Sequence, residues 1–285
     1  MTRRRSALAF GSIVLAVAFA ACGGVPITVN GLGQAAIPTP TPISDPKVII
    51  ARSFAAVARA QTVHLDASLN GSINAGALSR FAGGFPLGLI GKLKLDDSTV
   101  SGDLDIENLK AHASAKVPAL LGLTVDVIVA DGYTYTKSSL SGGKYRKSRT
   151  SPTLQPAGSL APSASRDVAG ALDALEAGME RAGVTSTFVG HDMVDGRDAF
   201  HVAIWIPPDE INRLISSAGG NATAGLTIDS VSLDCWADVD TFLPSRIESK
   251  VTSSTLGVVS VTATLTRYNE PVTIDAPPDS QVQAG

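Results

Sequence analysis

Apolar and polar residues alternate along much of the chain. The segment HLDASLNGSI places Leu65, Ala67 and Leu69 on one side and polar residues on the other, which is the pattern of a half-buried strand. Similar alternation recurs later, and it predicts about ten strands in total, mostly adjacent in sequence and antiparallel. The later strands are expected at residues 98–106, 110–117, 123–129, 132–136, 145–149, 185–206 (a hairpin), 226–239, 245–254 and 258–268.

Three segments show helical spacing instead. Asp45-Pro46 is typical of an N-cap followed by proline at the first helical position. Ile50, Phe54 and Val57 then recur on one face of a helix expected at 47–60. Two more helices are expected, one at 167–182 and a short one that starts near Pro208 and ends before Gly219. Many strands with few helices predict an α+β fold, in which one long curved antiparallel sheet, a half-barrel, is covered by about three helices.

The N-terminal residues have the features of a signal peptide. Arg3, Arg4 and Arg5 precede an apolar run that ends at Ala21, and this run is shorter than the ~20 residues of a membrane-spanning helix. Ala20-Ala21-Cys22 resembles a bacterial lipobox, in which the cysteine is acylated, for example with palmitate, and becomes the mature N-terminus. Phe19 departs from the pattern, since leucine is commonest there. The alternative is ordinary cleavage, which releases a secreted protein.

An uncharged stretch rich in Gly, Pro and Thr follows Cys22 and extends to Asp45. Such a composition suits a flexible tether between an anchor and a folded domain. We therefore expect a signal peptide at 1–21, the lipidated cysteine and linker at 22–45, one domain at 46–278, and a tail at 279–285.

The amino-acid composition limits the kinds of molecule that this protein is expected to bind. Removing residues 1–21 takes away three arginines and no carboxylate, so the formal net charge falls from −3 to −6. We see no basic patch in the mature chain and expect no nucleic-acid partner. Aromatic residues make up only 5% of the chain. The small residues Ala67, Ala111, Ala113 and Ala115 on predicted apolar faces therefore either pack against a close partner or line a hollow.

Motifs for catalysis or metal binding are missing. The cluster HDMVDGRDAFH, from His191 to His201, fits a hairpin with an Asp195-Gly196 turn, and its spacing matches no EF-hand or HExxH site. The chain has no GxSxG, no phosphate-binding Gly-rich loop and no CxxC pair. Cys235 is expected to be a small buried hydrophobe. We expect no enzyme activity, no metal and no cofactor.

The order of these elements behind a lipoprotein signal resembles the LppX/LprG-type lipoproteins of mycobacteria, which have a LolA-like fold. The resemblance covers about 46–278 and is carried by HLDASLNGS, STVSGDLDI, VDVIVADGYTYTKSS, VDGRDAFHV, DCWADVDTFLPSRIES and TATLTRYNEPVTIDAPP. It implies a half-barrel sheet wrapped around helices and enclosing an apolar cavity for lipids. It also implies a non-enzymatic protein that binds acylated lipids or glycolipids and helps move them outward.

Sequence and resemblance together predict a lipid-anchored carrier on the extracytoplasmic face of the cell membrane. We expect a monomer that binds membrane lipids or glycolipids, with an envelope transporter as a candidate partner. The alternative is an envelope sensor or scaffold that uses the same fold to bind a protein. The residues expected to line the cavity are Leu65, Ala67, Leu69, Val100, Leu104, Ile106, Ala113, Ala115, Val125, Val127, Val129, Val202 and Ile204. A loop at the cavity mouth is expected to carry Phe81, Phe85, Leu87, Leu89 and Ile90.

Overall fold

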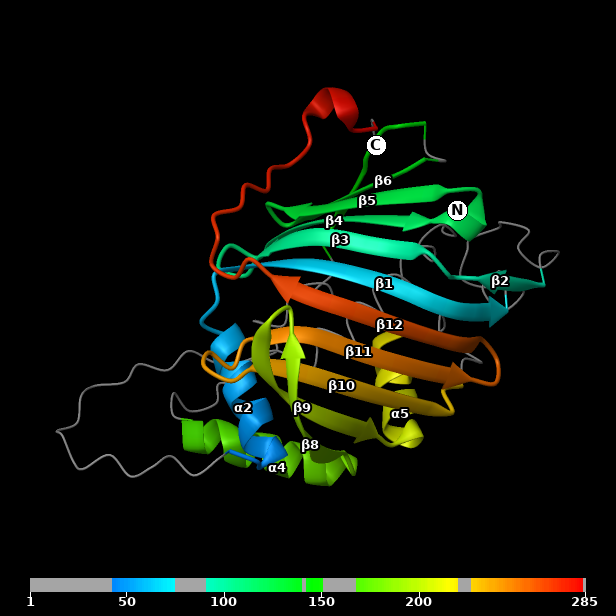
Figure 1. Ribbon diagram of the computed structural model, residues 1–285. Coiled ribbons are helices and arrows are strands. Elements are labelled where there is room, and N and C mark those ends of the chain that lie inside the picture. Colours follow the sequence, from blue (N-terminus) through cyan, green and yellow to red (C-terminus); the bar gives the residue numbers. More distant parts are fainter. Residues whose placement is uncertain (1–42, 75–90, 140–141, 151–167, 220–226, 284–285) are drawn as a thin grey trace.

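A single large antiparallel sheet dominates the computed structural model, which describes residues 43–74, 91–139, 142–150, 168–219 and 227–283. Twelve strands belong to it, in the order β7-β6-β5-β4-β3-β1-β12-β11-β10-β9-β8, with β2 paired to β1 (Figure 1). The sheet is curved and does not close, so the predicted α+β class and curved antiparallel sheet are confirmed. The strands are β1 Thr62–Asn74, β2 Lys92–Lys94, β3 Ser98–Asp105, β4 Lys110–Val117, β5 Leu123–Ala130, β6 Tyr133–Ser138, β7 Arg146–Arg149, β8 Thr185–Val194, β9 Arg197–Ile206, β10 Ser230–Asp238, β11 Pro244–Ser253 and β12 Gly257–Thr266.

At the centre of the sheet, the first strand of the domain pairs with the last one. β1 pairs with β12, so Ala67 lies opposite Ala263, and on its other side β1 pairs with β3, where Ala67 lies opposite Val100. Most other neighbours follow one another in sequence and are joined by short turns. Two of these turns are the predicted ones, with positive φ at Asp131-Gly132 (54° and 77°) and at Asp195-Gly196 (49° and 80°). Paired positive φ values are those of the tight turns that suit β-hairpins.

The side chains of β1 define the two faces of the sheet. We call the face that carries Val63, Leu65 and Ala67 the inner face, and the opposite one the outer face. The inner face holds the largest core cluster, where these residues pack with Leu233, Ile247, Ala263 and Leu265.

The helices gather at one end of the sheet, near β8 to β11 (Figure 1). α2 (Pro46–Val57) begins as predicted, because the Asp45 carboxylate accepts a hydrogen bond from the Lys47 backbone N–H at 2.9 Å. Its Ile49 and Ile50 pack on Phe200, Val202 and Ala237 of the inner face.

The other two helices complete this end. α4 (Val168–Ala182) packs against α2, where Lys47 Nζ lies 3.5 Å from Glu176 Oε1. α5 (Pro208–Gly219) buries Ile211 against Ile228 and Val231. All three helices were predicted from their spacing. No helix in the described ranges is long and apolar enough to span a membrane.

The C-terminal residues cover the outer face of β5 and β6. Ile274 is buried with Ile128, Ala130 and Tyr135, which point away from the inner face. A short 3-10 turn, η6 (Asp279–Gln281), follows, and Val282 forms a parallel bridge with Tyr145. The described part of the predicted tail is therefore packed on the sheet.

Candidate functional site

The inner face is an apolar surface that runs through the register of many strands. One row across the sheet is Val125–Ala115–Val100–Ala67–Ala263–Ile247–Cys235–Val202. Because residues opposite one another in paired strands point to the same side, this row forms one continuous stripe. Its alanine side chains are short, whereas larger side chains at the same positions would fill the space above the sheet.

Over β9 to β11 the helices close this surface. An apolar pocket remains between α2 and the sheet, with a volume of about 20 Å³. That is room for about one water molecule. Its walls include Phe54, Val202, Leu233, Cys235 and Ile247. Cys235 thus lies on the inner face of β10, half-buried among apolar side chains, as a small hydrophobe would.

Over β3 to β5 the same face is more open. The apolar side chains there are half-buried, although their strands lie well inside the sheet. The described helices lie at the other end, over β8 to β11 (Figure 1). Because its side chains are short and partly exposed, this half of the inner face is the best surface for an apolar ligand among the described residues.

The residues predicted to line a cavity all belong to the inner side. Val202, Leu65 and Ala67 are buried in core clusters, and Ile106 follows β3 and packs against one of them. The predicted mouth loop and Cys22 lie outside the described residues, so their roles stay predictions. The half-buried members are Leu69, Val100, Leu104, Ile106, Ala113, Ala115, Val125, Val127, Val129 and Ile204.

Gly102 sets how closely β3 and β4 approach under this face. A Cβ at Gly102 would lie 2.5 Å from the His112 carbonyl oxygen and 2.9 Å from the Ala113 Cβ. Both distances are shorter than van der Waals contact, so only glycine fits between these neighbours. Gly102 stands in the row Val127–Ala113–Gly102–Leu65, where it continues the stripe of small residues.

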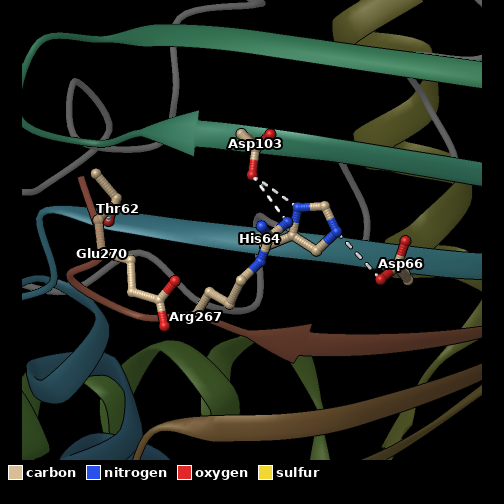
Figure 2. A network of polar contacts seen from close by, with 6 residues as sticks. All are labelled: Thr62, His64, Asp66, Asp103, Arg267 and Glu270. Atoms are coloured by element: carbon tan, nitrogen blue, oxygen red, sulfur yellow. Dashed lines mark hydrogen bonds and ion pairs between the residues drawn. The ribbon is translucent and has the colours of Figure 1, made fainter. Parts of the chain in front are cut away.

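Histidines and carboxylates gather on the outer face. His64 lies between two carboxylates, with Nδ1 2.7 Å from Asp103 and Nε2 3.1 Å from Asp66 (Figure 2). Arg267 approaches Asp103 at 3.5 Å. Figure 2 also shows Thr62 on the same strand as His64. These contacts tie β1, β3 and the end of β12 together on the side away from the apolar surface.

The histidines of the HDMVDGRDAFH cluster take part in separate contacts. His191 pairs with Asp198 at 3.3 Å, whereas His201 lies 3.1 Å from Asp192 and 2.9 Å from Asp234. Within the described ranges, no group of three or more His, Cys, Asp or Glu residues could hold a metal ion. These pairs bridge neighbouring strands and act as cross-strand contacts.

Asp126 centres a further outer-face network. It accepts hydrogen bonds from Ser114 Oγ at 2.8 Å and from the Tyr145 hydroxyl, and it pairs with His112 at 2.9 Å. Burial opposes ionisation of Asp126, but the hydrogen bonds from Tyr145, His112 and Ser114 outweigh it, and the pKa of this carboxyl is lowered. Burial, and then the bond to Asp126, raises the pKa of the Tyr145 phenol.

A basic edge contradicts one expectation from the sequence. We expected no basic patch, but edge strand β7 and the residue before Tyr145 supply Lys144, Arg146, Lys147 and Arg149, all exposed. The error arose because net charge averages over the chain and hides a local run. Lys147 lies over the Tyr133 ring, 4.1 Å from its centroid.

Several hydroxyls on the inner face of the sheet, or on the helix that packs against it, are buried without a hydrogen-bond partner in the described part of the chain. They are Ser98 Oγ on β3, Thr136 Oγ1 on β6, Ser186 Oγ on β8 and Ser53 Oγ on α2. Buried polar groups are usually hydrogen-bonded. Sequence reasoning missed these hydroxyls, because a serine or threonine in an alternating strand gives no sign of whether it is satisfied.

Comparison with known families places the chain. A model of the LppX_LprAFG lipoprotein family matches residues 45–274. This chain belongs to that family. The family expected from the sequence is therefore confirmed. No match was found among curated protein sequences.

Solved structures with similar folds have low sequence identity to this chain. Mycobacterium tuberculosis lipoprotein LppX is 17% identical, with 81% of this chain and 100% of LppX covered at a TM-score of 0.46. LprF from Mycobacterium bovis is 18% identical, with 82% and 98% covered at 0.44. A LolA superfamily protein from Nitrosomonas europaea is 5% identical, with 85% and 98% covered at 0.26.

Proposed function

We propose that this member of the LppX_LprAFG lipoprotein family binds acylated lipids or glycolipids on the inner face of its sheet and carries them within the cell envelope. Acyl chains would lie on the half-buried apolar surface of β3 to β5, and polar headgroups would stay near its rim. Burial of apolar surface contributes ~0.8 kcal/mol per methylene, so two or three chains bind tightly without specific polar contacts.

One observation carries this proposal. The inner face over β3 to β5 is apolar, carries short side chains and is half-buried, whereas on the outer face of β5 the apolar residues Ile128 and Ala130 are buried in a cluster with Ile274. A protein that only needed a stable sheet would gain more by burying both faces. The lipobox-like Cys22 and the linker after it support attachment to the extracytoplasmic side of the membrane.

Native mass spectrometry tests the proposal. Residues 23–285, which contain every described element, would be purified from a bacterial host without detergent. We expect a discrete added mass that fragments into acyl chains. A bare protein mass that stays unchanged after incubation with lipid vesicles would contradict it.

One feature favours the alternative function, that of an envelope sensor or scaffold that binds a protein partner. The pocket between α2 and the sheet is nearly closed, at about 20 Å³, and a sensor or scaffold for a protein partner would need no larger one. Such a protein would give the bare mass and would capture a partner from envelope extracts through an outside surface.

A further inference from the structure

Charge is strongly segregated between the two faces of the sheet. In the described strands β1 to β7 and β10 to β12, the register places one charged residue on the inner face, Arg146 of β7. The other charged residues of these strands, such as Asp103, Asp126 and Glu248, face outward. In β8 and β9, Asp198 and His191 share the side of Phe200, but they contact each other. Arg146 differs, because it is an inner-face charge without an ion-pair partner among the described residues.

The position of Arg146 is at the rim of the open apolar surface. Its partner across β6 is Thr136, and the row continues through Val127, Ala113 and Gly102 to Leu65. Arg146 is exposed and forms no ion pair with any described residue. Thr136 Oγ1, next to it, is buried and has no hydrogen-bond partner in the described chain.

Polarity along this row thus changes in one direction. It begins with a guanidinium, passes a hydroxyl, and continues over four apolar or glycine positions. The distance from β6 to β1 is four strand spacings, or ~19 Å. That is close to the ~15 Å spanned by the acyl chains of one leaflet, half of a ~30 Å hydrocarbon core. An amphiphile with a negative head and long apolar chains has the same order of chemistry.

We propose that Arg146 and Thr136 bind the anionic headgroup of the carried lipid, while its acyl chains lie across β5, β4 and β3 toward β1. The cargo is then an acylated lipid whose head bears a phosphate or similar anion. A guanidinium suits this role, because its planar donors match phosphate oxygens two at a time. This inference rests on the proposed function and deepens it.

Another explanation for Arg146 is protection of the sheet edge. Charged residues on edge strands prevent pairing with another chain. That role would be shared by Lys147 and Arg149, which lie on the same strand and face outward. It requires charge on β7 but does not require that the charge be on the inner face, so the two explanations predict different results for Arg146 and Arg149.

A matched pair of variants separates them. Residues 23–285, as wild type, Arg146→Gln, Arg149→Gln and Thr136→Val, would be incubated with vesicles of equal dioleoyl phosphatidylglycerol and dioleoyl phosphatidylcholine. Native mass spectrometry then gives the ratio of the two retained lipids. Both arginines are exposed on one short strand, so each substitution removes the same charge with a similar effect on folding, which circular dichroism would verify.

We expect the wild type to retain phosphatidylglycerol preferentially. Arg146→Gln should lower the ratio about tenfold, the effect of losing one charge-assisted hydrogen bond, and Thr136→Val should lower it less. Arg149→Gln should leave the ratio within about twofold, since the wild-type inner face is unchanged. Equal effects of the two arginine variants would overturn the inference. Retention of both lipids without preference would overturn it while leaving the proposed function standing, whereas retention of neither lipid would overturn both.

Discussion

The hydroxyl of Tyr145 donates a hydrogen bond to the carboxylate of Asp126, joining the residue before edge strand β7 to the outer face of β5. Lys137 lies 3.5 Å from the same carboxylate and 4.5 Å from the centroid of the Tyr145 ring. The β6–β7 edge, where we place the lipid headgroup, is therefore fixed from behind by an ionised acid.

The lowered pKa of Asp126 makes this support depend on pH. A carboxyl whose pKa is lower in the folded state stabilises the fold above its unfolded value, ~3.9, and that contribution is lost as pH falls through the folded pKa. We expect Asp126→Asn to reduce the free energy of unfolding by about 1 kcal/mol at pH 7, and by less at pH 3. Urea unfolding of both proteins across this range checks the trend. Asp131→Asn, an exposed turn substitution, is the control, and a difference that grows in acid would contradict the prediction.

Substitution of Gly102 should be costly for a steric reason. A Cβ there would overlap the His112 carbonyl oxygen and Ala113 on the adjacent strand. We expect Gly102→Ala to lower the free energy of unfolding by about 2 kcal/mol, within the range for overpacking. Gly178 in α4 has open space around it, so Gly178→Ala should be neutral or stabilising by up to about 1 kcal/mol. Equal melting temperatures for the two variants would show that β3 and β4 can separate freely.

Ile274 should stabilise the fold although it lies beyond the last strand. It is 6% exposed and covers Ile128 and Tyr135. Ile274→Ala should cost about 2–4 kcal/mol of unfolding free energy, as for other large-to-small core changes. The exposed neighbour substitution Asp275→Ala should change it by less than about 0.5 kcal/mol. If chemical denaturation finds both variants as stable as the wild type, the C-terminal residues are not part of the cooperative unit.

Filling the open half of the inner face should reduce lipid retention. Ala113→Phe would occupy space for about two methylenes, which corresponds to about a tenfold loss of affinity. Lys116→Phe adds the same ring to the same strand on the outer face, and retention should then be unchanged. Native mass spectrometry after incubation with vesicles measures both. Undiminished retention by a folded Ala113→Phe protein would place the acyl chains elsewhere.

Much of the fold could be predicted from the sequence because strand alternation has a fixed period. The pattern around Leu65, Ala67 and Leu69 placed these residues on one face, and the helix at Pro46 followed from its cap. Strand β2 was missed, since three residues carry too little pattern to detect.

The site was less predictable. Alternation says which residues share a face within one strand, but pairing decides which strands share a surface. The covering of Ile128 by Ile274 depends on where the C-terminal chain runs, and the residues around Ile274 show no period that foretells it. The inward direction of Arg146 follows from its register with Thr136, which a short basic strand does not reveal by itself.

The pairing of β1 with β12 also governs the order in which the protein can be built. His64 has its partner at Thr266, so the middle of the sheet stays incomplete until almost the whole chain has left the ribosome. Contacts of such long sequence separation form slowly. A chain truncated before Gly257 should accordingly show no cooperative unfolding transition. Completion of the sheet is therefore expected to follow the synthesis of β12 instead of accompanying the synthesis of β1.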